Sequence, residues 1–132
     1  MNTKVLRRGN VVTDGAFVFI VEEIYGNTIT GSCNEMFEIQ YGLNAGNIVP
    51  VILTEEWLWQ LGCRQKKRKN WWRLPKSNPY KCFRLMLMAN GCGLFMALED
   101  GNYRMIRAFD YVHELQNLVQ SLTDHELPIY EK

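Results

Sequence analysis

Histidine is scarce in this sequence, and the cysteines lack the spacing of a metal or redox site. Two histidines and four cysteines occur among 132 residues. No two cysteines form a CxxC pair, and no histidine lies at ligand spacing from a cysteine. P-loop, Rossmann and EF-hand patterns are also missing. We therefore expect no metal and no cofactor, and we expect reduced thiols, as in a cytosolic protein.

A catalytic arrangement is equally hard to find. No serine or cysteine in a recognisable elbow accompanies His113, and His125 lies close to the C-terminal end. The acidic pairs at residues 22–23 and 55–56 consist of adjacent residues, which do not share one face of a helix or strand. The pair at 55–56 is explained by the helix dipole. The sequence therefore predicts a binding protein and not an enzyme.

Long apolar runs are missing as well. No stretch approaches the ~18 apolar residues of a membrane span, and no apolar segment follows the basic residues of the N-terminal MNTKVLRRGN. The length suits one domain over residues 1–132, and the hydrophobic content of 47% suits a packed core. We expect a single soluble domain in the cytoplasm of a host cell, with no membrane partner.

Acidic residues are absent from Trp57 to Leu98, although nine lysines and arginines occur there. The rest of the chain carries six lysines and arginines against fourteen acidic residues, a net charge of −8. The overall charge of +1 therefore conceals a basic centre within an acidic frame.

The basic residues concentrate in a predicted loop insert over residues 64–81. Lysine and arginine neutralise phosphates, and tryptophan can stack on an unpaired base, so the pattern favours RNA, DNA or a nucleoprotein as the partner. An acidic protein surface, or a solvated loop whose tryptophans enter the core, are the alternatives. The candidate contact residues are Arg64, Lys66, Lys67, Arg68, Lys69, Trp71, Trp72 and Arg73.

The N-terminal half predicts short antiparallel strands of the kind found in SH3-like barrels. Asp14-Gly15 and Tyr25-Gly26-Asn27 are turn signals, because glycine tolerates a positive φ. Pro50 confines its stretch to a sheet edge or a strand entry. The expected extended segments are Lys4–Arg8, Val11–Thr13, Ala16–Ile24, Thr28–Thr30, Glu35–Tyr41 and residues 48–53.

Residues 53–62 carry the signals of a two-turn helix. Thr54 is a suitable N-cap, and the acidic residues behind it suit the helix dipole. Leu53 and Leu58 have the spacing of a hydrophobic staple, and Gly62 can end the helix. The side chains expected in the core are Trp57, Leu58 and Leu61.

The last third predicts a β-meander followed by a helix, which makes the fold class α+β. Asn90-Gly91 and Asp100-Gly101 separate three apolar runs, at Cys82–Ala89, Cys92–Glu99 and Tyr103–Phe109. Asp110 is the expected N-cap of the helix, whose apolar stripe should cover the meander. The stripe consists of Leu115, Leu118, Val119 and Leu122. The side chains expected in solvent are Glu114, Gln116 and Gln120.

Several segments together resemble a family of small uncharacterised proteins encoded in Bacteroidota genomes, phages and mobile elements. The similar segments are LRRGNVV, GNTITG, LTEEWLWQLG and YVHELQNLVQSLTDHEL. The basic stretch Arg64–Arg73 departs from the short link usual in that family. The resemblance implies a phage or mobile-element accessory protein that acts by binding, for example as an inhibitor of host defence such as an anti-CRISPR protein that contacts a CRISPR effector.

Overall fold

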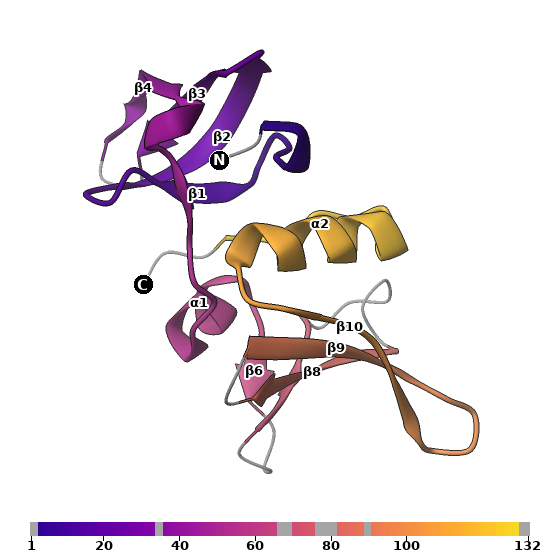
Figure 1. Cartoon of the computed structure of the whole chain (residues 1–132). Helices are drawn as coiled ribbons and strands as arrows, with labels where there is room; N and C mark the ends of the chain where they lie inside the picture. Colours follow the sequence, from indigo (N-terminus) through magenta and orange to yellow (C-terminus); the bar gives the residue numbers. More distant parts are fainter. Residues whose placement is uncertain (1–2, 34–35, 66–69, 76–81, 89–90, 130–132) are drawn as a thin grey trace. The chain divides into compact units, whose positions relative to one another are not determined.

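Two compact units make up the structure, a computed structural model that describes residues 3–33, 36–65, 70–75, 82–88 and 91–129. The first unit comprises residues 1–52 and 111–117, and the second comprises residues 53–110 and 118–132. Each unit holds one antiparallel sheet (Figure 1). The α+β class predicted from the sequence is confirmed. The single domain over residues 1–132 stays a prediction.

The first sheet has the strand order β4-β3-β2-β1-β5 in the described part of the chain. Gly26, with a φ of 58°, lies in the two-residue turn that joins β2 and β3. Pro50 lies in the edge strand, as its missing N–H predicts. The SH3-like likeness itself stays a prediction. The elements are η1 (Thr3–Val5), β1 (Val11–Thr13), β2 (Val18–Tyr25), β3 (Thr28–Cys33), β4 (Met36–Asn44), η2 (Ala45–Asn47) and β5 (Val49–Pro50).

The strand expected at Lys4–Arg8 is wrong, because this segment turns on itself. Residues Thr3–Val5 form a 3₁₀ turn in which Leu6 N donates to Thr3 O at 3.1 Å. A second turn follows, closed by Asn10 Oδ1, which accepts from Arg7 N at 2.7 Å. Such local hydrogen bonds compete with strand pairing for the same backbone groups.

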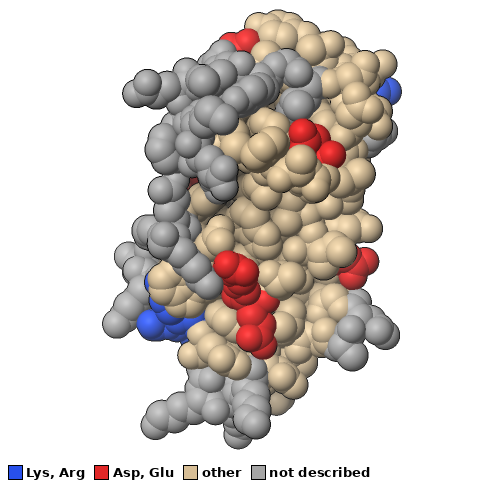
Figure 2. Space-filling model, turned by 90° about the vertical axis from the view of Figure 1, so that its left-hand side faces the viewer, with Lys and Arg blue, Asp and Glu red and all other residues tan. Residues whose placement is uncertain are grey.

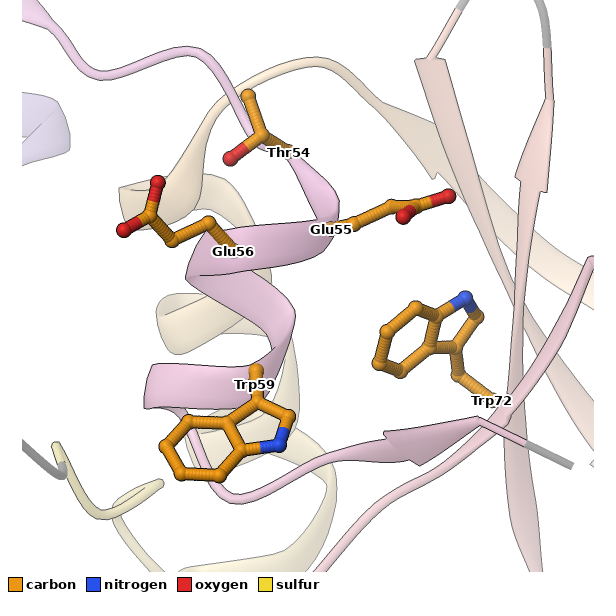
Figure 3. Close-up of a pocket in the computed structure, with 5 residues that line it drawn as sticks. All are labelled: Thr54, Glu55, Glu56, Trp59 and Trp72. Carbon is orange, nitrogen blue, oxygen red and sulfur yellow. The ribbon is translucent and has the colours of Figure 1, made fainter. Parts of the chain in front are cut away.

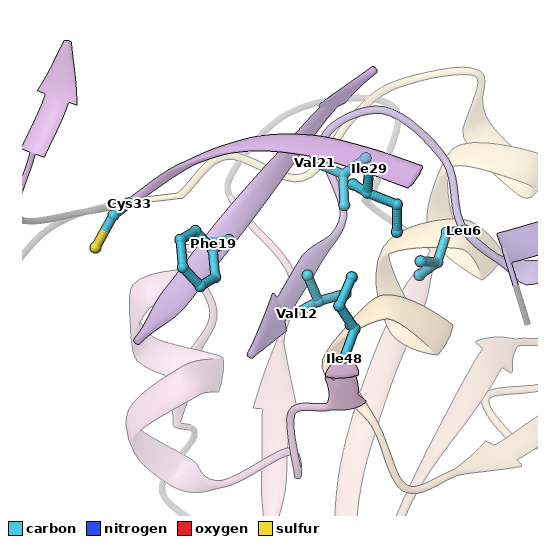
Figure 4. Packing of buried hydrophobic residues seen from close by; sticks show 7 residues of the cluster. All are labelled: Leu6, Val12, Phe19, Val21, Ile29, Cys33 and Ile48. Atoms are coloured by element: carbon cyan, nitrogen blue, oxygen red, sulfur yellow. The ribbon is translucent and has the colours of Figure 1, made fainter. Parts of the chain in front are cut away.

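Most side chains in the core of the first unit come from strands, and Leu6 and Ile48 join them from the connecting segments (Figure 4). Val12 and Ile29 are completely buried, and Val21 is 1% exposed. Successive strand residues point to opposite faces, so the alternation in β2 and β3 places one set of side chains inward. The cluster consists of Leu6, Val12, Phe19, Val21, Ile29, Cys33 and Ile48.

A polar network fastens the N-terminal segment to the helix α2 (Val112–Thr123). Gln116 Nε2 donates to Gly9 O, and Gln116 Oε1 accepts from Val11 N, both at 2.9 Å. Arg7 Nε donates to Asn117 Oδ1 at 3.0 Å. All these residues belong to the first unit. The network therefore joins segments that lie more than a hundred residues apart in sequence.

Three expectations for α2 are corrected. Gln116 is fully buried instead of exposed, because its amide bonds buried backbone groups. Leu122 is 43% exposed instead of packed, in the last turn of the helix. The helix begins at Val112, one residue later than an N-cap at Asp110 requires. Residues 112–117 of α2 belong to the first unit, and residues 118–123 belong to the second.

The second sheet has the order β10-β9-β8-β7-β6 in the described ranges. Strands β8, β9 and β10, which follow one another in sequence, form the predicted meander. Part of the expected loop insert is strand instead, because Arg64 and Arg73 pair their backbones and Trp72 pairs with Leu85. The elements are α1 (Glu55–Gln60), β6 (Arg64–Gln65), β7 (Trp71–Arg73), β8 (Phe83–Met88), β9 (Gly91–Ala97) and β10 (Tyr103–Phe109).

Helix α1 begins as the sequence predicts. Thr54 Oγ1 accepts from Trp57 N at 3.3 Å, which confirms the N-cap. Leu58 and Leu61 are completely buried, also as expected. Trp57 is only half-buried, which corrects the expectation for this side chain. Consecutive helical residues point about 100° apart, so Trp57 and Leu58 cannot both face the core directly.

Candidate nucleic-acid interface

The register of the second sheet aligns three arginines in one row. Arg64 pairs with Arg73, Arg73 pairs with Arg84, and Arg84 pairs with Phe95. Directly paired residues point to the same face of a sheet. Like charges opposite one another destabilise a sheet, so the row is not explained by the stability of the fold.

An aromatic cluster lies on the same face. The Trp71 ring centroid is 5.3 Å from that of Phe95, at an interplanar angle of 64°, and 5.2 Å from that of Tyr103. Trp71 precedes Arg73 by two residues, which places both on one face. Tyr103 is 43% exposed, while Trp71 and Phe95 are half-buried. The cluster therefore keeps ring surface accessible to a partner.

Gly93 makes room for this cluster. It pairs with Met86, the cross-strand partner of Trp71, so its missing side chain would point to the same face. A Cβ at Gly93 would lie 3.0 Å from the Phe95 ring and 3.2 Å from Met88 Cε. The neighbouring side chains thus lie over bare backbone, where a larger residue would displace them.

Part of the opposite face of the sheet belongs to the core. Trp72 is 4% exposed, and its pairing partner Leu85 and the next residue in that row, Leu94, are completely buried. Trp72 therefore cannot offer a ring face to a base, and it takes the core position that the sequence left open as an alternative. Of the two neighbouring tryptophans, Trp71 is the contact candidate.

The remaining candidate residues differ in the contacts that they make within the protein. The Arg64 side chain already has partners, because its Cζ lies 4.4 Å from the Trp59 ring centroid and its Nη1 donates to Cys63 O at 2.8 Å. Arg73 is half-buried beside the aromatic cluster, with no carboxylate paired to it in the described part of the chain. Residues 66–69, with the predicted contacts Lys66, Lys67, Arg68 and Lys69, lie outside the described residues. They connect β6 and β7 in sequence.

Three residues of this face were not among the predicted contacts, namely Arg84, Phe95 and Tyr103. They come from β8, β9 and β10, and only the sheet register brings them beside Trp71 and Arg73. A weak signal exists in the sequence, because Arg84, Met86 and Met88 alternate with apolar core residues. That alternation predicts a shared face but not its neighbours.

The strands of the second sheet carry little negative charge. In the lower half of Figure 2, a cationic group lies beside the larger of two acidic groups. No residue from Trp57 to Leu98 is acidic, so β6, β7, β8 and β9 bring no negative charge to the arginine row. The electrostatic character of this face therefore favours an anion.

No family model, curated protein or solved structure matches this chain. The resemblance to proteins of Bacteroidota phages and mobile elements stays a prediction. None of the helices in the described ranges has the length and apolarity of a membrane span. Among the described side chains, no group of three or more His, Cys, Asp or Glu is placed to bind a metal ion.

The buried titratable groups lie outside this face. Burial raises the pKa of the Cys63 and Cys92 thiols to about 12, which keeps both protonated and weakly nucleophilic. Burial also lowers the pKa of His113, whose ring stacks on Tyr111 at a centroid distance of 6.0 Å.

Proposed function

We propose that the protein binds single-stranded nucleic acid on the open face of its second sheet. The observation that carries this proposal is the contact of Trp71 with Phe95 and Tyr103 beside the row of Arg73 and Arg84. The rings offer surfaces on which unpaired bases stack, and Arg73 meets the phosphates between them. Arg84 adds positive charge to the same face, although its Nη1 donates to Phe83 O at 2.7 Å.

The arrangement favours single strands over duplexes. Aromatic stacking requires bases that are splayed out, and every base has a π-face, so the binding tolerates different sequences. Each stacked base contributes about 1–3 kcal/mol. The lysine-rich residues 66–69 lie between two neighbouring strands of this sheet in sequence and add to the same positive charge.

The biological role that we propose combines this surface with the resemblance to phage and mobile-element proteins. A phage or mobile-element protein with such a face can occupy the RNA or DNA of a nucleoprotein, including a CRISPR effector, in the host cytoplasm. Inhibition of host defence is therefore the role we propose, with nucleic-acid contact as its physical basis.

The test is fluorescence anisotropy with a labelled single-stranded oligonucleotide of about 12 nucleotides, measured over a range of salt concentrations. We expect Arg73→Gln to weaken binding and to reduce the slope of log affinity against log salt by about 0.7. Tyr103→Ala should cost about 1–3 kcal/mol with little change in that slope.

Arg104→Gln is the matched control, because Arg104 is exposed and pairs with Met96 on the opposite face of the sheet. It removes the same charge and should leave the affinity nearly unchanged. Equal losses in the Arg73 and Arg104 variants would show a non-specific effect of charge. That result, or the absence of oligonucleotide binding at low salt, would contradict the proposal.

A further inference from the structure

The two edge strands of the second sheet differ in how open they are. Strand β6 is two residues long, and its Arg64 already stacks on Trp59, in the last turn of α1 (Figure 3). Strand β10 is seven residues long, and all of its residues except the last are exposed. In the described part of the chain, no strand pairs with the outer side of β10. An edge of this kind offers free backbone groups to an added strand.

The hairpin before β10 shows which of these backbone groups point outward. Leu98 N donates to Asn102 O at 2.8 Å. The facing pairs of an antiparallel ladder alternate between hydrogen-bonded and non-hydrogen-bonded pairs. Because the register continues from this bond without a break as far as Met105, the N–H and C=O groups of Tyr103 and Met105 point away from β9. These groups are placed to pair with a strand on the outer side.

A β-bulge brings the two arginines of β10 to the same side of the sheet. The register with β9 shifts after Met105. Arg104 pairs with Met96, and Arg107 pairs with Leu94, two residues away in β9. Residues two apart in a strand share one side, and so do their direct partners. In a regular strand, arginines three residues apart would point to opposite sides.

The charge of this edge selects an acidic strand. Arg104 and Arg107 are exposed, and no carboxylate pairs with either of them among the described side chains. A second copy of β10 would bring two more arginines to the same side of the sheet, where like charges repel. Alternate residues of a strand lie about 6.8 Å apart, which is also the separation of the β9 residues opposite the two arginines. Carboxylates at alternate positions of an added strand therefore reach both arginines.

The other side of the edge is apolar. Met105 is 45% exposed and pairs with Phe95, and Tyr103 on the same side is 43% exposed. In the added strand, the residues between the carboxylates point to this side. Apolar side chains at those positions would cover the exposed surface of Tyr103 and Met105.

We propose that β10 binds an extended segment of a partner protein in which acidic residues alternate with apolar ones. The segment adds a strand to the second sheet and pairs its backbone with Tyr103 and Met105. Its carboxylates meet Arg104 and Arg107. This site does not depend on the proposed binding of nucleic acid, which uses the open face of the sheet and not the edge.

The test is a titration of the full ¹⁵N-labelled chain with acetyl-Val-Asp-Val-Asp-Val-amide, without nucleic acid, followed by NMR. We expect saturable shifts of the Tyr103 and Met105 backbone N–H signals to lower field, and a Kd on the order of 1 mM for so small a ligand. The same peptide with asparagine in place of aspartate should bind about threefold or more weakly, because two exposed ion pairs are lost. Equal binding of the two peptides would overturn the assignment of an acidic partner.

A third peptide tests the backbone pairing without any change to the protein. N-methylation of the valines keeps both carboxylates but removes the N–H groups that would donate to β10. This peptide should bind at least about threefold more weakly than the unmethylated one. Undiminished binding would show that the peptide does not add a strand.

Arg107→Gln should weaken binding of the aspartate peptide about twofold or more, as loss of an exposed ion pair does. Arg8→Gln is the matched control, since Arg8 is also exposed but belongs to the first unit. Equal effects of the two variants, or unmoved Tyr103 and Met105 signals, would refute the site. Dilution of the chain without peptide should leave both signals in place; if they move, the edge is occupied by a second copy and the proposed partner is wrong.

Discussion

Replacement of Gln116 by leucine should destabilise the first unit by about 2 kcal/mol. The side chain is completely buried and makes two hydrogen bonds of 2.9 Å to backbone groups of Gly9 and Val11. Leucine has a similar size but leaves both groups without a partner, at about 1–3 kcal/mol each. Burial of the apolar leucine returns about 2 kcal/mol of this loss.

The assay is urea unfolding followed by circular dichroism, with the change read from the midpoint at constant m-value. Gln120→Leu is the control, because Gln120 is a half-buried residue of the same helix with no side-chain hydrogen bond among the described contacts. It should change the stability by less than about 0.5 kcal/mol. Equal stability of the two variants would refute the structural role of Gln116.

Gln116→Glu adds a pH test of the same network. Burial should raise the folded-state pKa of this carboxyl above its unfolded value of about 4.3. The unfolded chain then loses its proton first as the pH rises, so the stability of the variant falls above about pH 4.3. The protonated form can still donate to Gly9 O, whereas the ionised form cannot. A loss of stability relative to wild type that does not grow between about pH 4.5 and 7.5 would contradict the buried placement.

Two further predictions concern backbone and thiols. Gly91→Ala should lower the melting temperature clearly more than Gly101→Ala. Both glycines have positive φ, but a Cβ at Gly91 would lie 2.5 Å from a carboxylate oxygen, whereas nothing lies within 4 Å of a Cβ at Gly101. Similar melting temperatures of the two variants would contradict the close contact at Gly91. A thiol reagent at about pH 8 should modify the exposed Cys82 rapidly in the folded protein. Mass spectrometry should find Cys63 and Cys92 modified only after unfolding, because thiols with a pKa of about 12 form little thiolate at that pH.

Local signals were sufficient for the elements whose determinants are close together in sequence. The cap at Thr54 and the runs that became β8, β9 and β10 depend on residues within one turn or one hairpin. Pro50 marked an edge because its missing N–H is a property of the residue itself. The basic character of the central segment likewise follows from composition alone.

The sequence by itself therefore determined the α+β class, the meander and the positive charge at the centre of the chain. Only the tertiary structure decided which side chains meet. Gln116 is buried because its partners lie more than a hundred residues earlier in the chain. Trp71 and Trp72 look equivalent in sequence, yet the pleat turns one towards the aromatic cluster and the other into the core. Burial and register are set by pairing between distant strands, which no local pattern specifies.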